Sequence, residues 1–297
     1  MAIDGVFIED TFAEAFPIAA AQLTITAETP AWALTAAQVV TGYATSVIGC
    51  DAEAGIERVL PEGETPDGRP GVSVLLLAFN QDALQKAVVN RVAQCVLTCP
   101  TTACYNALPL VKEKTIRVGG SLRFFGDGFQ CSKLLDGRRF WRLPVMDGEF
   151  VCEDEFGTVK GVAGGNFLIL GESQAAALAA AEAAVAASAG VRGVILPFPG
   201  GIVRSGSKVG SRYKKLRAST NDAYCPTLRG ITRSALPEGV NAVYEIVIDG
   251  LDLASVEEAT RVGVKAACVP GVIRISAGNY GGKLGPHHIY LHKVLGS

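Results

Sequence analysis

The chain has 297 residues, of which 49% are hydrophobic and 19% are charged, and its formal net charge is −2. This composition supplies ample apolar surface for a core and argues against intrinsic disorder. The near-neutral charge argues against a nucleic-acid-binding protein, which normally has a basic excess. The length is typical of two domains.

The apolar segments and the cysteines predict a cytoplasmic protein that does not cross a membrane. The first ten residues lack the basic and apolar regions of a secretory signal. The most continuous apolar stretch, Ala175–Val191, is mostly alanine and contains Glu182, which makes it a poor membrane span. The eight cysteines are then expected to be reduced. The spacing of Cys95, Cys99 and Cys104 matches no common zinc or iron–sulfur pattern, so we expect no metal site.

Hydrophobic periodicity and turn residues predict the same order of elements in both halves of the chain. The elements expected in the first half are strands Leu23–Thr26, Ser46–Gly49 and Val72–Phe79 and helices Trp32–Ala44 and Gln81–Val96, with a loop at Ala54–Ile56. Those expected in the second half are strands Phe167–Leu170, Gly193–Leu196 and Val243–Ile248, a helix capped by Ser173 that runs to Ser188, and helix Leu253–Ala267.

This order is that of the split βαβ unit, in which helices cover one face of an antiparallel sheet. We therefore predict an α+β protein with two similar ferredoxin-like lobes, residues 1–145 and 146–297. Turn glycines indicate extra β-structure at about 115–141 in the first lobe. A hinge is expected near Pro144–Glu149. The alternative is that the two halves are generic α/β segments whose likeness is a coincidence.

Three glycine-rich stretches of the second half could bring backbone close to a ligand: Lys160–Asn166, Pro197–Ser211 and Asn279–Lys283. Gly201 and Gly206 have the spacing of a phosphate loop. The lysine does not follow directly, however, which excludes a P-loop nucleoside triphosphatase.

Positive charge is concentrated in one segment of the second half. This segment, Arg204–Arg217, contains no acidic residue and six basic ones: Arg204, Lys208, Arg212, Lys214, Lys215 and Arg217. Such a run suits a ligand with carboxylates or a phosphate. The alternative is a solvated basic loop.

Glu245 is the strongest candidate for acid–base chemistry. It has apolar neighbours on both faces of the predicted strand Val243–Ile248, which is typical of a central, buried strand. Burial raises the pKa of a carboxyl that has no cation beside it, and a protonated carboxyl can act as a general acid. The alternative is a strand-end glutamate paired with an arginine.

Several common catalytic arrangements are absent from the sequence. All three histidines lie within the last eleven residues, and there is neither a G-x-S-x-G elbow nor a G-x-G-x-x-G dinucleotide motif. The sequence therefore favours chemistry without a metal, a redox cofactor or a covalent nucleophile.

Long strings of the sequence resemble the formylmethanofuran–tetrahydromethanopterin formyltransferase family, including its methylotroph-type members. The resemblance runs from about Gly5 to Gly285. The matching strings are Glu9–Pro17, Thr65–Gly71, Gln94–Thr102, Phe124–Gly128, Gly148–Phe150, Lys160–Phe167, Pro197–Gly210, Cys225–Leu228 and Val243–Gly250.

The resemblance implies an acyltransferase that moves a formyl group reversibly between methanofuran, or methylofuran, and N5 of tetrahydromethanopterin. The two carriers are then substrates, and no permanently bound cofactor is expected. The resemblance also implies a homo-oligomer, a dimer or a tetramer. In methylotrophs it implies the D subunit of a formyltransferase/hydrolase complex, with other subunits as partners.

By resemblance, Lys160–Asn166, Pro197–Gly210 and Val243–Gly250 are the active-site strings. Within them we predict Glu245 as the catalytic general acid. The predicted substrate-binding residues are Gly164, Gly165, Asn166, Gly200, Gly201, Arg204, Ser205, Ser207, Lys208 and Tyr244. Two other functions remain open: a non-catalytic scaffold subunit of a C1 complex, and a small-molecule sensor.

Overall fold

The computed structural model describes residues 1–296, which form two compact units. Unit 1 combines Met1–Pro17 with the chain from Val162 onward, and unit 2 is Ile18–Gly161. Strand β3 (Phe12–Thr26) and strand β12 (Val159–Gly171) each contain one of these boundaries. The unit boundaries at Pro17 and Gly161 differ from the predicted lobe boundary at residue 145. The division into two lobes at that residue stays a prediction.

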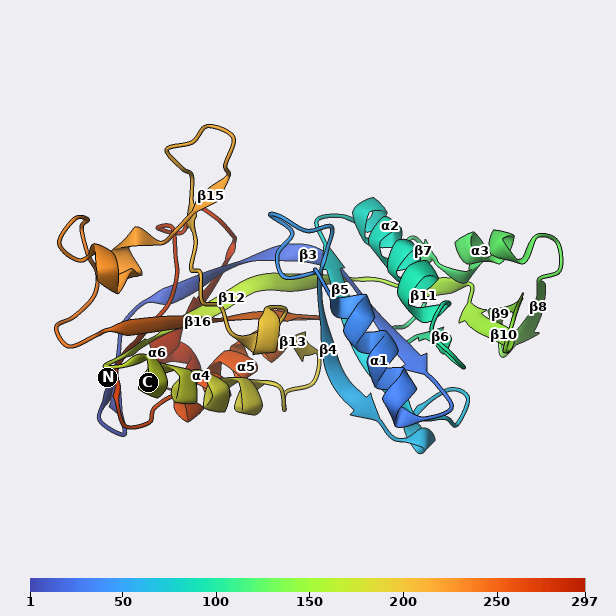
Figure 1. Cartoon of the computed structure of the whole chain (residues 1–297), viewed down its shortest axis with the longest axis horizontal. Helices are drawn as coiled ribbons and strands as arrows, with labels where there is room; N and C mark the ends of the chain where they lie inside the picture. The colour runs from blue at the N-terminus through green and yellow to red at the C-terminus, as the bar shows by residue number, and fades with distance from the viewer. Residues whose placement is uncertain (297) are drawn as a thin grey trace. The chain divides into compact units, whose positions relative to one another are not determined.

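Unit 2 contains an antiparallel sheet in the order β4–β5–β3–β6. Helices α1 and α2 pack against β5, and together they enclose an apolar core (Figure 1). The bounds are α1 Pro30–Thr41, β4 Glu53–Leu60, β5 Gly71–Ala78, α2 Gln81–Arg91 and β6 Ala103–Asn106. A π-helical turn, Val92–Val96, continues α2 over the full range predicted as helix.

The sheet of unit 2 continues beyond β6 through a parallel pairing with β10, followed by β9 and β8. The bounds are β7 Thr115–Arg117, α3 Gly119–Leu122, β8 Cys131–Leu135, β9 Arg138–Val145, β10 Gly148–Glu153 and β11 Glu155–Gly157, and β11 pairs with β7. The region 115–141, predicted as extra β-structure, therefore contains strands but also a helical turn. Pro144 and Glu149, near which the hinge was predicted, are paired in the β9–β10 hairpin, and the hinge between lobes stays a prediction.

The strand predicted at Ser46–Gly49 is wrong. The N–H groups of Gly49 and Cys50 both donate to the carbonyl of Ser46, at 3.0 and 2.8 Å, which closes a turn. The second strand of this unit is instead β4, which includes the predicted loop Ala54–Ile56.

Unit 1 contains a second antiparallel sheet, in the order β17–β12–β16–β13. The bounds are α4 Gln174–Ser188, β13 Val194–Ile195, β16 Ala242–Gly250, α5 Leu253–Ala266 and β17 Val272–Ser276. Helices α4 and α5 pack against each other and against β16, with a separate apolar core between helices and sheet (Figure 1). The coarse prediction of an α+β protein is confirmed.

Short elements complete unit 1. They are β1 Ala2–Ile3, β2 Val6–Ile8, β14 Lys208–Val209, β15 Ala218–Ser219, β18 His287–Tyr290 and α6 Leu291–Val294. Strand β2 adds to the sheet parallel to β17, and β18 pairs with the first residues of β3. Strands β14 and β15 form a hairpin that projects from the unit (Figure 1).

Side-chain caps define where the two alanine-rich helices begin. The hydroxyl of Thr29 accepts the N–H of Trp32 at α1, and the hydroxyl of Ser173 accepts the N–H of Ala176 at α4. Each cap satisfies one of the backbone donors that a helix start leaves unpaired. The predicted cap at Ser173 is confirmed.

Helix α5 lies close to its neighbours at Gly263. A Cβ atom at this position would lie 2.5 Å from the Ser188 hydroxyl and 3.0 Å from the Phe167 ring. In a helix interior, alanine is more favourable than glycine by about 1 kcal/mol. Overpacking a core, however, costs about 1–3 kcal/mol. We therefore expect Gly263→Ala to destabilise the protein despite its higher helix propensity, as measured by denaturant unfolding.

The matched control is Gly230→Ala, because a Cβ atom at Gly230 would have no atom within 4 Å. Its free energy of unfolding should stay close to that of the wild type. A Gly263→Ala variant that is more stable than wild type would contradict the close helix contact.

Candidate active site

A cavity of about 350 Å³ lies in unit 1 beside strand β16. One wall is formed by sheet residues, namely Leu168 of β12 with Val243 and Glu245 of β16. The other walls are the segments Val203–Gly206 and Tyr224–Thr227, together with Asn221. Side chains of β16 alternate, so Tyr244 and Ile246 pack into the core on the helix side while Val243 and Glu245 face the cavity.

The segment Val203–Gly210, called the strap below, is joined to β16 at Glu245. The N–H of Val203 donates to the carbonyl of Glu245 at 2.8 Å, and the N–H of Glu245 donates to the carbonyl of Val203 at 3.0 Å. On its other side Glu245 is paired with Leu168 in the β12–β16 ladder. The backbone of Glu245 is therefore fixed on both sides by strands distant in sequence.

Burial raises the pKa of the Glu245 carboxyl from 4.5 to about 7. The physical cause is desolvation, because the charged carboxylate loses water that the protein does not replace. Among residues 1–296, no lysine, arginine or histidine forms an ion pair with Glu245. A substantial fraction of this carboxyl is therefore protonated at neutral pH.

Three of the predicted site residues meet at this cavity. Arg204 and Ser205 line it together with Glu245, which brings a cation, a hydroxyl and a protonated carboxyl to one place. Lys208 lies further along the strap and forms an ion pair with Asp222, which lowers the pKa of that carboxyl. Ser207 faces another segment, because its carbonyl accepts a hydrogen bond from the hydroxyl of Tyr280 at 3.3 Å.

The predicted residues at the start of β12 have structural contacts away from the cavity. The N–H of Gly164 donates to Asp249 at 2.9 Å, and a Cβ atom at Gly165 would lie 2.5 Å from Val256. The side-chain carbonyl of Asn166 accepts the N–H of Gly278 at 2.6 Å, and its amide donates to the carbonyl of Gly164.

The remaining predicted residues also lie outside the lining of the cavity. Gly200 and Gly201 have positive φ angles of 62° and 78° in the turn before the strap, where Gly201 lies close to Val185 of α4. The ring of Tyr244 packs into the helix-side core. The substrate-binding roles of all these residues stay predictions.

Sequence reasoning gave no role to two groups of residues that the structure places at the site. Asn221 and Tyr224–Thr227 form a wall of the cavity, although part of that wall, Cys225–Leu228, was among the strings that resemble the family. Tyr280 contacts the strap from a glycine-rich stretch whose only sequence signal was its glycines. Their proximity depends on long-range folding.

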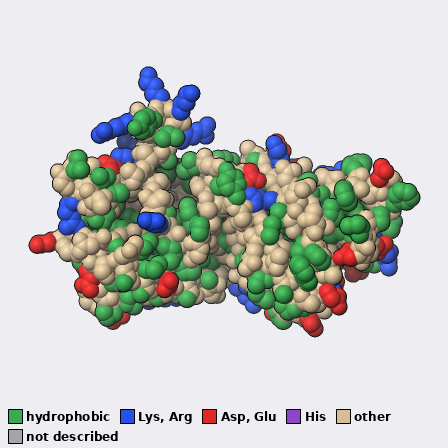
Figure 2. Space-filling model, in the orientation of Figure 1, with side chains coloured by type: hydrophobic (Ala, Val, Ile, Leu, Met, Phe, Trp, Pro, Cys, Tyr) green, Lys and Arg blue, Asp and Glu red, His purple; other side chains and the backbone are tan. Residues whose placement is uncertain are grey.

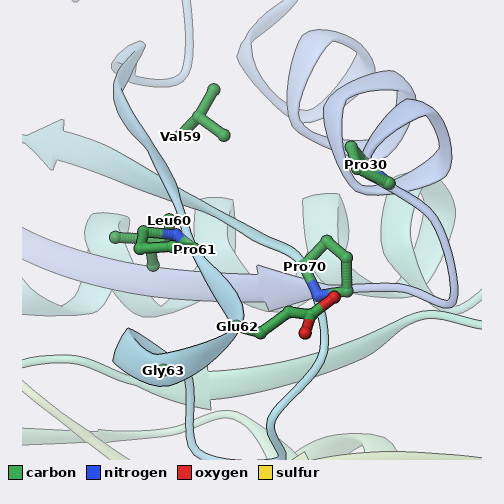
Figure 3. A pocket seen from close by; sticks show the side chains of 7 residues that line it. All are labelled: Pro30, Val59, Leu60, Pro61, Glu62, Gly63 and Pro70. Carbon is green, nitrogen blue, oxygen red and sulfur yellow. The ribbon is translucent and has the colours of Figure 1, made fainter.

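A second, more open hollow of about 620 Å³ lies in unit 2. It is lined by Pro30, Val59, Leu60, Pro61, Glu62, Gly63 and Pro70, as Figure 3 shows. Its lining is aliphatic apart from one carboxylate, so it offers no acid–base pair. The cavity at Glu245 is the better candidate for catalysis.

The described residues offer neither a metal-binding cluster nor a membrane-spanning helix. Residues 1–296 contain no group of three or more His, Cys, Asp or Glu side chains placed to hold a metal ion. No helix in the same range is long and apolar enough to cross a lipid bilayer.

The fold and the cavity define an α+β protein with a protonatable acid, a cation and a hydroxyl in one pocket. Comparison with known proteins identifies the class. The family model for formylmethanofuran–tetrahydromethanopterin formyltransferase matches residues 1–145, and the model for the proximal lobe of the same family matches residues 148–294. The chain belongs to the formylmethanofuran–tetrahydromethanopterin formyltransferase family.

Relatives match over nearly the whole chain. The formylmethanofuran–tetrahydromethanopterin formyltransferase of Methylococcus capsulatus is 56% identical over 99% of this chain and 100% of its own. The solved structure of the Methanosarcina barkeri formyltransferase is 54% identical, with a TM-score of 0.94 over 99% of this chain and 100% of that one.

A third relative is a chain of the formyltransferase/hydrolase complex of Methylorubrum extorquens, solved in complex with methylofuran. It is 52% identical, with a TM-score of 0.95 over 99% of this chain and 98% of that one. The family resemblance noted in the sequence is confirmed.

The raised pKa of Glu245 predicts a pH-dependent stability difference. The folded-state pKa of about 7 lies above the unfolded value of 4.5, so the folded state binds this proton more tightly. Folding is therefore penalised by this group as the pH rises from about 4.5 to 7, by up to about 3 kcal/mol. We expect Glu245→Gln to raise the thermal midpoint relative to wild type at about pH 8 and to change it little at about pH 4. Equal midpoint differences at both pH values would show that the carboxyl is not desolvated.

Proposed function

We propose that this protein catalyses the reversible transfer of a formyl group between formylmethanofuran, or the methylofuran analogue, and N5 of tetrahydromethanopterin. Family membership over the whole chain supports this reaction. The observation that carries the mechanism is the desolvated carboxyl of Glu245, which faces a cavity together with Arg204 and Ser205.

Formyl transfer requires a proton donor, because a formamide is unreactive and its leaving amine is basic. The lone pair of N5 attacks the formyl carbon, and the C–N bond to methanofuran breaks from the tetrahedral intermediate. Glu245 gives its proton to the leaving nitrogen and recovers one from N5, so the acid is regenerated in each cycle. A carboxyl with a pKa of about 7 can both lose and regain a proton near neutral pH.

The developing negative charge on the formyl oxygen needs hydrogen-bond donors. The hydroxyl of Ser205 makes no hydrogen bond within residues 1–296 and lines the same cavity as Glu245, so it is free to donate. The backbone N–H groups of Ser205 and Gly206 are further candidates. Donors fixed in advance stabilise an oxyanion without reorganising during the reaction.

Substitution of the acid tests the mechanism. We expect Glu245→Gln to bind both carriers with affinities close to wild type and to lose at least about 99% of turnover, because general-acid catalysis typically contributes a factor of 10² or more. The measurement is a spectroscopic assay of formyl transfer from formylmethanofuran to tetrahydromethanopterin, with binding measured by calorimetry. Near wild-type turnover would remove Glu245 from the mechanism.

The matched control for this experiment is Glu238→Gln. Glu238 is an exposed glutamate of the same unit that lies outside the cavity. Its substitution replaces a carboxyl by an amide in the same way but away from the cavity, so its turnover should equal that of the wild type.

Arg204 is proposed to bind an anionic group of a carrier. We expect Arg204→Gln to raise the KM of that carrier by about tenfold, since a charged hydrogen bond contributes about 1.5–3 kcal/mol, with a smaller change in kcat. Arg212→Gln is the control, because Arg212 is also exposed, in the turn between β14 and β15, but does not line the cavity. Equal effects of the two substitutions would indicate general electrostatic attraction instead of a specific contact.

The finer fold is also proposed: each unit is a ferredoxin-like split βαβ unit. The order β17–β12–β16–β13 in unit 1 and β6–β3–β5–β4 in unit 2 both correspond to strands 4–1–3–2 of that motif, with antiparallel neighbours.

Association with other subunits is proposed from the relative that forms part of the formyltransferase/hydrolase complex. The homo-oligomer and the cytoplasmic location stay predictions.

A further inference from the structure

The part of the strap that borders the cavity is held at its two ends. Val203 is joined to β16 by two backbone hydrogen bonds, and Lys208 forms an ion pair with Asp222. Between them lie Arg204–Ser207. Among residues 1–296, only one side chain hydrogen-bonds to these four residues: the hydroxyl of Tyr280, which donates to the carbonyl of Ser207 at 3.3 Å.

Tyr280 lies in the loop Gly278–Gly285, whose start is fixed by two contacts. The N–H of Gly278 donates to the side-chain carbonyl of Asn166 in β12 at 2.6 Å. The amide of Asn279 donates to the hydroxyl of Thr11 at 3.1 Å. The residue before Tyr280 is thus anchored to the N-terminal segment of unit 1.

The far end of the loop is fixed by Glu14. This residue is only 2% exposed, and its Oε2 atom accepts the N–H of Leu284 at 3.1 Å. The loop passes close to the neighbouring ring of His288, because a Cβ atom at Gly282 would lie 3.3 Å from that ring. Gly282 also has a φ of 75°, so both space and backbone conformation favour glycine there.

The electrostatic surroundings of Tyr280 suit a hydrogen-bond donor. Burial and the charges of Glu245 and Glu14 all raise the pKa of the phenol, which keeps its proton in place. Both carboxyls belong to residues already described: Glu245 lines the cavity, and Glu14 fixes the far end of the loop.

We propose that Tyr280 is a positioning residue for formyl transfer, which fixes Arg204–Ser207 so that Arg204 and Ser205 face the cavity at Glu245. This inference rests on the proposed function. If the strap is ordered before a carrier binds, the binding free energy is not reduced by the entropic cost of ordering it. Loss of the Tyr280 hydrogen bond should therefore weaken binding more than it slows the chemical step. Tyr280 acts through the strap and not on the reacting atoms.

The test is Tyr280→Phe, which removes the hydroxyl and keeps the ring. The KM of at least one carrier should rise about fivefold, the value of one net hydrogen bond, while kcat stays within about twofold. The thermal midpoint should match that of the wild type. Tyr290→Phe is the matched control, because Tyr290 is 44% exposed against 37% for Tyr280 and its hydroxyl has no hydrogen bond within residues 1–296. Its kinetic constants should not change.

Unchanged KM values for both carriers in Tyr280→Phe would overturn the inference. So would a loss of kcat accompanied by a lower thermal midpoint, because that pattern indicates general damage to the fold. Glu245→Gln, measured in parallel, separates this inference from the proposed function. If Glu245→Gln is inactive and Tyr280→Phe behaves as wild type, only the positioning role is wrong, whereas a fully active Glu245→Gln contradicts the mechanism itself.

Discussion

The site depends on the desolvation of one carboxyl on a central strand. Glu245 lies between the β12 ladder on one side and the strap on the other, and its backbone is hydrogen-bonded to both. No cation within residues 1–296 forms an ion pair with it, so burial raises its pKa to about 7 instead of being offset by a partner. An adjacent arginine at ion-pair distance would remove this property. The partial burial of one side chain therefore connects the fold to the candidate site.

The cavity is built on the sheet face that the helices leave open. On the other face, α4 and α5 pack so closely that alanine and glycine are the fitting residues at their contacts. That dense layer holds β16 in place, and the alternation along the strand then separates Tyr244, in the core, from Glu245, in the cavity. The packed core and the candidate site therefore lie on opposite faces of one strand.

Local patterns in the sequence correctly predicted those features that are determined by residues close together in the chain. The cap at Ser173, the strand around Val243–Ile248 and the desolvation of Glu245 all follow from nearby side chains, and the structure agrees with each. The strand predicted at Ser46–Gly49 was wrong because a short apolar run is also compatible with a turn. Ile48 in this turn is 57% exposed.

Long-range contacts were beyond such reasoning. Strand β4 carries Glu57, an unusual residue for a buried strand. It is accommodated because Ser73 of the adjacent strand β5 and Gln22 of β3, one strand further, donate hydrogen bonds to it. In the same way, Asn166 was predicted as a ligand contact from its position in a glycine-rich string. The structure shows in addition that its side-chain carbonyl accepts the N–H of Gly278, more than a hundred residues away in sequence.

The hairpin of β14 and β15 has a consequence for how carriers reach the cavity. Its exposed turn contains Arg212, Lys214, Lys215 and Arg217 and no acidic residue, and Figure 2 shows these basic side chains extending from the projection. Exposed charges on this projection interact with anions through solvent, at a range set by the Debye length of about 8 Å in physiological salt. Anionic molecules are thereby drawn toward the strap before any specific contact forms. The rate of this encounter is then expected to fall as the ionic strength rises.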